Sequence, residues 1–173
     1  MTGATFSFLF FTGSPAPAQA QAREEAKDTN KDGKPDEWKI YDGDKLLRIE
    51  RDRDGDGRRE VVIFFKEDKP VRAEIDRNGD GKPDMIIFYK DGKQDREQAD
   101  LNLDGKPDMW VYYKNGIKDL AIMDKNYDGK PDAWFYYKER GLKISAGVMD
   151  SNFDGKPDRT VGEVPKEETR KPW

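Results

Sequence analysis

Short apolar runs recur at regular intervals along most of the chain, with polar stretches between them. Five of the runs hold at most five residues and are rich in aromatic and β-branched side chains; they lie at residues 38–41, 61–65, 85–89, 109–113 and 133–137. Runs of this length and composition favour strands over helices. We therefore expect a β-strand at each of them.

Turn-forming residues follow each run. Asp-Gly or Asn-Gly dipeptides, which accept the positive φ angles of two-residue hairpin turns, begin at Asp42, Asp91 and Asn115. Residues 139–141 follow the fifth run, and residues 67–70 follow the second, where we expect a looser turn. Each run is thus predicted to turn back into a second strand.

The returning segments are less uniform than the apolar runs. Four of them carry apolar residues, at 46–49, 71–75, 117–123 and 142–149, whereas residues 94–99 are nearly all polar and have the weakest strand pattern. Strands with one solvated face fit this composition. The expected fold is all-β: tandem 24-residue β-hairpin repeats in an elongated, open antiparallel sheet, with a small propeller-like or closed arrangement as the alternative.

A nine-residue string occurs six times and sets the spacing of these hairpins. Its clearest copy, DRNGDGKPD at residues 76–84, has oxygen-bearing side chains at positions one, three, five and nine and glycine at position six. Successive copies start 24 residues apart, except the last pair at 26, with first residues Asp28, Asp52, Asp76, Asp100, Asp124 and Asp150. A fixed period in this range is typical of a repeat architecture whose units cannot bury an apolar face alone.

The two ends of the chain differ from the repeats. Residues 1–22 contain an apolar run followed by small residues at alternating positions, which is the pattern of a signal peptide and predicts export to the periplasm, the cell surface or the exterior. This segment is too short to span a bilayer. Residues 23–27 are interpreted as a linker, 28–164 as the repeat domain and 165–173 as a disordered tail.

Oxygen ligands crowded around a glycine turn are what a hard cation such as Ca²⁺ needs from a short loop. Three or four carboxylates within nine residues repel one another unless a cation neutralises them. We therefore predict a Ca²⁺ site in each loop, with side-chain ligands at positions one, three, five and nine and the backbone carbonyl at position seven. The predicted ligands are Asp28, Asn30, Asp32, Lys34, Asp36; Asp52, Asp54, Asp56, Arg58, Glu60; Asp76, Asn78, Asp80, Lys82, Asp84; Asp100, Asn102, Asp104, Lys106, Asp108; Asp124, Asn126, Asp128, Lys130, Asp132; and Asp150, Asn152, Asp154, Lys156, Asp158.

A second interpretation of the loops needs no metal. Asp, Asn and Gly also form good Asx-turns between strands. Such a turn does not require an acidic residue at position nine, yet all six copies have one there. The repeated carboxylate at position nine therefore favours the metal site.

The loops resemble calcium loops of known families. DRNGDGKPDMIIF and DLNLDGKPDMWVY are similar to the loop and following strand of FG-GAP/VCBS-type repeats, and at loop level only they resemble EF-hands, dockerins and thrombospondin type 3 repeats. Position twelve is apolar or lysine, whereas an EF-hand has a glutamate there, so a conventional EF-hand is rejected. Without that glutamate we expect weak Ca²⁺ binding, with a Kd of about 10⁻⁴ to 10⁻³ M. The FG-GAP/VCBS resemblance implies propeller blades and adhesion functions of secreted proteins, but a four-stranded blade needs more than the 24 residues of one unit.

Composition narrows the classes of function. The 173 residues include 32 Lys and Arg interleaved with 36 Asp and Glu, for a formal net charge of −4, and no basic stripe indicates nucleic-acid binding. Cys and His are absent, which removes disulfides, thiolate metal sites, thiol nucleophiles and the usual general base. All six loops are alike, so no residue is assigned as catalytic and the protein is expected not to be an enzyme.

Aromatic residues recur at equivalent positions of the repeats. Trp38, Trp110 and Trp134 share a row with Val62 and Ile86. A ladder of indoles could stack on sugar rings, which makes a carbohydrate-binding module the alternative function. The replacement of Trp by Val or Ile at two positions favours a role in the core instead.

The sequence as a whole predicts an exported, non-enzymatic, calcium-stabilised scaffold or adhesion module. Its expected partner is a protein or glycan at the cell surface, with no nucleic acid and no membrane span. An open sheet also exposes two backbone edges, so edge-to-edge self-association is a further expectation.

Overall fold

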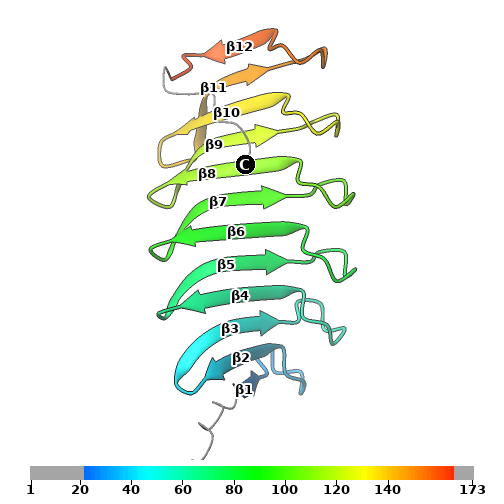
Figure 1. Cartoon of the computed structure of the whole chain (residues 1–173), viewed down its shortest axis with the longest axis vertical. Helices are drawn as coiled ribbons and strands as arrows, with labels where there is room; N and C mark the ends of the chain where they lie inside the picture. Colours follow the sequence, from blue (N-terminus) through cyan, green and yellow to red (C-terminus); the bar gives the residue numbers. More distant parts are fainter. Residues whose placement is uncertain (1–21, 166–173) are drawn as a thin grey trace, which may run out of the picture.

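The computed structural model describes residues 22–165, which form one 12-stranded antiparallel sheet. The strands lie in chain order from β1 to β12, each paired only with its neighbours in the sequence (Figure 1). β1 and β12 lie at opposite ends, so the sheet is open and the predicted all-β hairpin array is confirmed. The predicted signal peptide and disordered tail fall outside the described residues, apart from Ala22 and Pro165.

Forward strands, which follow a nine-residue loop, alternate with return strands, which precede one. The forward strands are β2 (Glu37–Asp42), β4 (Val61–Lys66), β6 (Met85–Lys90), β8 (Met109–Lys114), β10 (Ala133–Lys138) and β12 (Arg159–Gly162). The return strands are β1 (Ala22–Lys27), β3 (Lys45–Arg51), β5 (Lys69–Ile75), β7 (Lys93–Ala99), β9 (Ile117–Met123) and β11 (Lys143–Met149). The nearly all-polar segment at β7 is therefore a strand like the others.

Strand β1 corrects the interpretation of residues 23–27 as a linker. All six of its residues pair with β2 in antiparallel register. The segment has no apolar face, but the edge of β2 offers hydrogen-bond partners to the backbone groups along one edge of β1. The guanidinium carbon of Arg23 also lies 4.4 Å from the centre of the Tyr41 ring, a cation–π contact between the two strands.

The tight turns lie along one side of the sheet and the nine-residue loops along the other (Figure 1). Asn115 and Gly116 have φ of 55° and 81°, as expected for their dipeptide. Glu67 and Asp68, where a looser turn was expected, form a two-residue turn of the same kind, with φ of 51° and 57°. The fifth hairpin has four turn residues, 139–142, between its paired strands.

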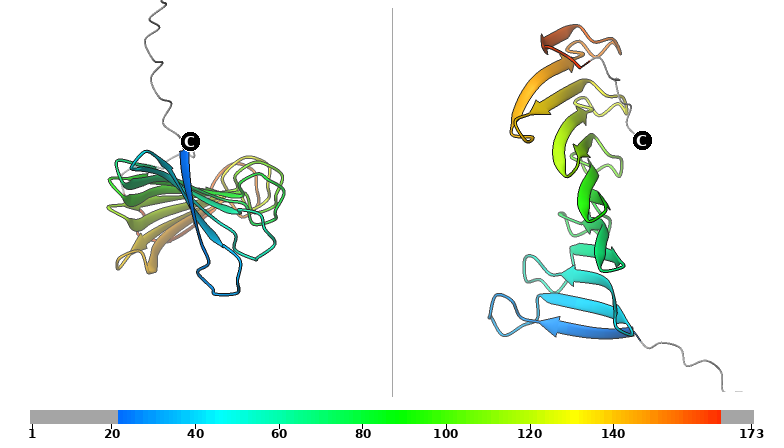
Figure 2. Two further views of the ribbon diagram at one scale, coloured as in Figure 1. Left: turned by 90° about the horizontal axis from the view of Figure 1, so that it is seen from below. Right: turned by 90° about the vertical axis from the view of Figure 1, so that its left-hand side faces the viewer.

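A β-bulge interrupts the pairing at the same place in each hairpin. Close to the turn, the return strand has one residue more than the forward strand opposite it. The five extra residues are Leu47, Val71, Asp95, Asp119 and Ser145. Bulges increase the right-handed twist of a strand pair. Their regular repetition fits the continuous twist of the sheet, which is plain when it is viewed from its end and from its side (Figure 2).

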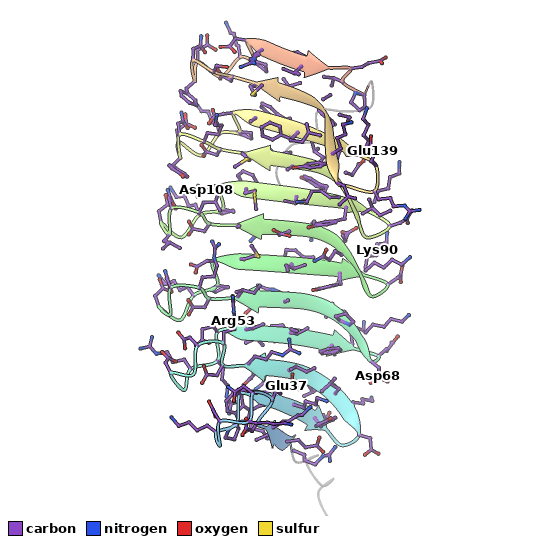
Figure 3. All side chains as sticks on the ribbon, turned by 180° about the vertical axis from the view of Figure 1, so that it is seen from behind. Glu37, Arg53, Asp68, Lys90, Asp108 and Glu139 are labelled. Carbon is purple, nitrogen blue, oxygen red and sulfur yellow. The ribbon has the colours of Figure 1, made fainter. Side chains whose placement is uncertain are left out.

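Figure 3 shows the side chains on the ribbon with the sheet viewed from behind. Successive residues of each strand point to opposite faces of this single-layer sheet. We name one the tryptophan face; it carries the row of cross-strand partners Trp38, Glu50, Val62, Glu74, Ile86, Gln98, Trp110, Ile122, Trp134 and Val148. The opposite, tyrosine face carries the row Tyr41, Phe65, Tyr89, Tyr113 and Tyr137.

The buried core cluster lies on the C-terminal half of the tryptophan face. It consists of Trp110, Leu120, Ile122, Tyr136 and Ala146, and Val164, beyond β12, packs against it. In the N-terminal half the return strands contribute ion pairs to this face, such as Arg72 to Glu74 at 2.7 Å. The two halves of one continuous sheet are therefore stabilised differently, by apolar packing at one end and by charge pairing at the other.

Candidate metal-binding loops

The six nine-residue loops stack on one another along one side of the sheet. In each successive pair, the backbone N–H at position one donates to the carbonyl at position nine of the preceding loop, over 2.7–3.0 Å. The donors are Asp52, Asp76, Asp100, Asp124 and Asp150. Because each loop follows a return strand, the sheet places equivalent positions two strands apart, roughly 10 Å. The loops thus form a continuous column of acidic residues.

The position-one aspartate organises each loop. In the third loop, Asp76 accepts hydrogen bonds from the N–H of Gly79 at Oδ1 and from the N–H of Gly81 at Oδ2, both at 2.8 Å. The bond from the position-six glycine recurs in all six loops. These glycines have φ between 85° and 95°, a conformation that glycine adopts at little cost, which explains why glycine is needed there.

Position four also has positive φ in every loop, which the sequence pattern did not reveal. Two loops have glycine there, but the last three have Leu103, Tyr127 and Phe153, with φ of 64°, 63° and 59°. Bulky residues rarely adopt this conformation. All three side chains are nearly half exposed.

Asx-type hydrogen bonds link positions three, five and seven. In the third loop, Asn78 Oδ1 accepts from the N–H of Asp80 at 2.9 Å, and Asp80 Oδ1 accepts from the N–H of Lys82 at 2.8 Å. The Asn78 side-chain amide also donates to Asp80 Oδ2 at 3.2 Å. The same three bonds occur in all five loops with Asn at position three. These bonds are those of a metal-free Asx-turn, so the second interpretation of the loops describes part of their geometry.

The position-nine carboxylate turns back toward the start of its loop. Asp84 Oδ2 accepts from the N–H of Arg77 at 2.7 Å and from the N–H of Asn78 at 3.2 Å. In the first loop, the Thr29 hydroxyl donates to Asp36 at 2.7 Å, and this bond, with backbone N–H groups, holds the pKa of Asp36 below its usual value. Hydrogen bonds thus tie the predicted side-chain ligands at positions one, five and nine of the third loop to the backbone of their own loop.

Several of these carboxylates are buried, although an isolated carboxylate is costly to bury. They belong to the last four loops: Asp84, Asp100, Asp108, Asp124, Asp132 and Asp150. Within residues 22–165, none of the six forms a salt bridge with Lys or Arg. Their partners are backbone N–H groups, so the negative charge is hydrogen-bonded but not neutralised.

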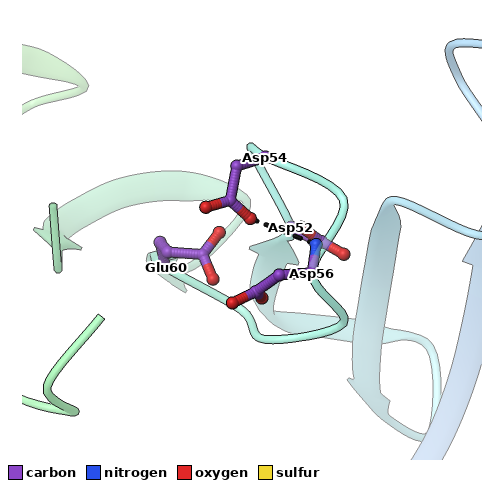
Figure 4. A group of neighbouring side chains, drawn as sticks. All are labelled: Asp52, Asp54, Asp56 and Glu60. Atoms are coloured by element: carbon purple, nitrogen blue, oxygen red, sulfur yellow. Dashed lines mark hydrogen bonds between the residues drawn. The ribbon is translucent and has the colours of Figure 1, made fainter. Parts of the chain in front are cut away.

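The second loop contains a cluster of four carboxylates (Figure 4). One oxygen each from Asp52, Asp54, Asp56 and Glu60 lies within 4.8 Å of the others, and the described part of the chain has no other such group of acidic residues. Glu60 Oε1 is buried there without a hydrogen-bond partner among these residues. Carboxylate oxygens suit Mg²⁺, Ca²⁺ and Mn²⁺. The cluster could therefore bind a metal ion, which would satisfy the unpartnered oxygen.

The three predicted tryptophans do lie in one row of the tryptophan face, but their environments differ. The Arg59 guanidinium carbon covers the Trp38 ring, 4.2 Å from its centre. Trp110 is only 5% exposed within the core cluster, and Trp134 packs against that cluster. The row therefore does not present three open indole faces.

The fold and the loops define a class: a single-layer antiparallel sheet of tandem β-hairpins, with an acidic cluster that could bind a metal ion. Comparison with known proteins adds no family, because no family model and no curated protein matches the chain. Within residues 22–165, no helix has the length and apolar character needed to cross a membrane.

Two solved structures show a partial likeness, both at 14% sequence identity. One is TarM, where the match covers 68% of this chain and 20% of TarM with a TM-score of 0.28. The other is an S. aureus TarM mutant in complex with fondaparinux, alpha-GlcNAc-glycerol and UDP. There the match covers 73% of this chain and 21% of the TarM chain, with a TM-score of 0.30. The chain spans about a fifth of those proteins, and at these TM-scores the likeness carries no argument.

Proposed function

We propose that this protein is an exported, non-enzymatic repeat protein that binds Ca²⁺ in its six loops and acts as a scaffold or adhesion module at the cell surface. The observation that carries the proposal is the set of buried loop carboxylates without a counter-charge in the described residues. Ca²⁺ is a hard cation that takes six to eight oxygen ligands in flexible geometry. It would neutralise these carboxylates without requiring a rigid cage.

The repulsion between loops supports the same proposal. The carboxylates of successive loops face the same side of the sheet, where they form one acidic column. Five loops have three side-chain carboxylates among the predicted ligands and the second has four. Bound cations would relieve the repulsion both within and between loops.

The expected energies make Ca²⁺ decisive for folding. Free Ca²⁺ at about ten times the Kd stabilises the folded state by about 1.4 kcal/mol per site. Six independent sites would contribute about 8 kcal/mol, and the whole stability of a domain is roughly 5–15 kcal/mol. The array would then be marginal without Ca²⁺ and well folded with it.

Thermal unfolding in millimolar Ca²⁺, Mg²⁺ or EDTA tests the proposal. We expect Ca²⁺ to raise the Tm well above its value in EDTA, and Mg²⁺ to raise it less, since Mg²⁺ demands stricter octahedral geometry and retains water. Asp128→Asn, at position five of the fifth loop, should reduce the Ca²⁺-dependent increase. The matched control Asp68→Asn, in a tight turn on the other side of the sheet, should leave that increase unchanged. A Tm that is the same in all three solutions would contradict Ca²⁺ binding.

The scaffold role depends on the surfaces that stay available for binding when Ca²⁺ occupies the loops. β1 and β12 each have one edge with no strand partner in the described part of the chain, so edge-to-edge association belongs to this proposal. Surface binding of the Ca²⁺-loaded protein to intact cells, compared with the same protein in EDTA, tests the adhesion role. Equal binding in both solutions would show that adhesion does not depend on Ca²⁺ in the loops.

A further inference from the structure

The second loop, residues 52–60, departs from the other five at positions that affect cation binding. Position three is Asp54 where the other loops have Asn, and position nine is Glu60 where they have Asp. Positions seven and eight are Arg58 and Arg59 where the others have Lys and Pro. At these four positions the second loop therefore has one more carboxylate than the other loops, and two guanidinium groups where the other loops have none.

Because position three is Asp54 and not Asn, the second loop lacks a hydrogen bond that the position-five carboxylate accepts in the other five loops. In the other five loops the Asn amide donates to the position-five aspartate at 3.2–3.3 Å. Asp54 has no such donor; its Oδ1 accepts from the N–H of Asp56 at 3.1 Å. Asp56 Oδ2 lies 3.4 Å from Arg58 Nε instead, and both of those side chains are well exposed. An exposed ion pair of this length is weak, so a divalent cation can displace it.

Glu60 provides the second observation. Its Oε2 accepts from the N–H of Arg53 at 2.8 Å, whereas its Oε1 is buried without a hydrogen-bond partner in the described residues. A buried carboxylate oxygen without a partner costs free energy that a bound cation would recover. The Glu60 carboxylate belongs to the group of four carboxylates that each offer one oxygen within 4.8 Å of the others, and Figure 4 shows this group.

We infer that the second loop is the preferred cation site of the array, and that it binds the first Ca²⁺ with higher affinity than the other five loops. The inference rests on the proposed function. Its physical basis is that affinity in oxygen sites rises with the number of charged ligands, and this loop has four carboxylates where the others have three.

The structure also provides a reporter for this site. Asp52, Asp54 and Asp56 line a cavity of about 330 Å³ between the first two loops, and Trp38 lines the same cavity. Arg59, next to the ligand Glu60, stacks on Trp38 and pairs with Glu50 of β3. Filling the second loop should therefore change the environment of Trp38.

Calorimetric titration of the full chain with Ca²⁺ tests the inference. We expect the wild-type protein to bind one equivalent before the rest, and Glu60→Gln to weaken that first step by about tenfold or more, since it removes one ligand charge. The matched control Asp84→Asn changes the same position of the third loop and should leave the first step unchanged. Equal effects of the two substitutions, or six indistinguishable sites in the wild type, would overturn this inference but leave the proposed function standing. A wild-type protein that binds no Ca²⁺ would overturn the proposed function as well.

A second variant covers the case in which Glu60→Gln does not fold. Asp54→Asn gives the second loop the residue that the other five have at position three, where the structure shows how Asn is accommodated. It should also weaken the first step, by about tenfold. Tb³⁺ luminescence sensitised by tryptophan gives an independent readout: the first equivalent should be bright in the wild type and dim in Trp38→Phe. A first equivalent of equal brightness in both proteins would place it in another loop.

Discussion

At the scale of single residues, the loops combine favourable and strained positions. The position-six glycines adopt positive φ at little cost. Leu103, Tyr127 and Phe153 adopt it at position four, where an L-residue with a large side chain loses roughly 1–2 kcal/mol. For Leu103 and Tyr127, a hydrogen bond of 2.7 Å from the backbone N–H to the position-one aspartate, Asp100 or Asp124, keeps the backbone in this conformation.

Tyr127→Asn should therefore stabilise the protein. Asn tolerates the left-handed region, and Tyr127 is 48% exposed, so little apolar burial is lost. We expect the free energy of unfolding to rise by about 0.5–1 kcal/mol, measured by urea denaturation. Tyr127→Phe, which retains the strain, serves as the control and should change stability little. A loss of stability in Tyr127→Asn would show that the phenol ring contributes more than its exposure indicates.

A second prediction concerns Tyr113 on the tyrosine face. Burial, together with the nearby charge of Glu97, raises the pKa of Tyr113 well above its ordinary value of 10.0, and its hydroxyl donates to Glu97 Oε2 at 3.0 Å. A raised folded-state pKa means that the neutral phenol contributes its full stability below about pH 10 and that this contribution is lost as the pH rises further. Tyr113→Phe should remove the latest step of an alkaline absorbance titration and reduce the fall in stability above pH 10. A late step that persists unchanged would assign it to another tyrosine.

At the scale of elements, most strands could be predicted from local pattern, whereas β1 could not. The apolar runs predicted β2, β4, β6, β8 and β10 because aromatic and β-branched side chains favour a half-buried pleated surface. β1 is exposed along its whole length, and its pairing depends on the open edge of β2. A strand that is held by its neighbour's backbone carries no hydrophobic pattern of its own.

The second hairpin turn offers a test at this scale. Glu67 and Asp68 both have positive φ, which suits Asn-Gly better than Glu-Asp. The double substitution Glu67→Asn and Asp68→Gly should raise the free energy of unfolding by about 1 kcal/mol. The reciprocal change Asn115→Glu and Gly116→Asp in the fourth hairpin should lower it by a similar amount. Chemical denaturation measures both, and a stability change of the same sign in the two variants would contradict the turn argument.

At the scale of the whole molecule, the sheet is a linear array in which each described strand pairs only with its neighbours in the sequence. Stability in such an array is approximately a sum of unit and interface terms. A 24-residue deletion that removes one loop and one hairpin should therefore leave a foldable protein.

Deletion of residues 76–99 tests this. It joins Ile75 to Asp100, so β5 would pair with β8 in place of β6, with Glu74 opposite Trp110 instead of Ile86. We expect a cooperatively folded protein that is shorter by two strand spacings, roughly 10 Å, in small-angle X-ray scattering. Deletion of the 12 residues 88–99 is the control, because it removes most of one hairpin but leaves its loop, and it should prevent cooperative folding. An unfolded 24-residue deletion would show that the units are not interchangeable.

The candidate metal site, like the strands, could be predicted from the sequence only in part. The four carboxylates of the second-loop cluster followed from the nine-residue string, since the loop that brings them together is local in sequence. The unpartnered oxygen of Glu60 did not, because its burial and its lack of a donor depend on the surrounding chain. The positive φ at position four was also hidden, since six loops place four different bulky or charged side chains and two glycines there.

The sequence by itself determined the period, the strands with apolar runs and the acidic loops between them, because each depends on residues within a dozen positions of one another. Only the tertiary structure decided that the sheet stays open, that residues 22–27 extend it and that the core gathers on the C-terminal half of the tryptophan face. These features depend on contacts between strands of different hairpins and, for Val164, on a segment that packs back across the sheet. A local pattern cannot specify which neighbour a backbone edge or an apolar face will meet.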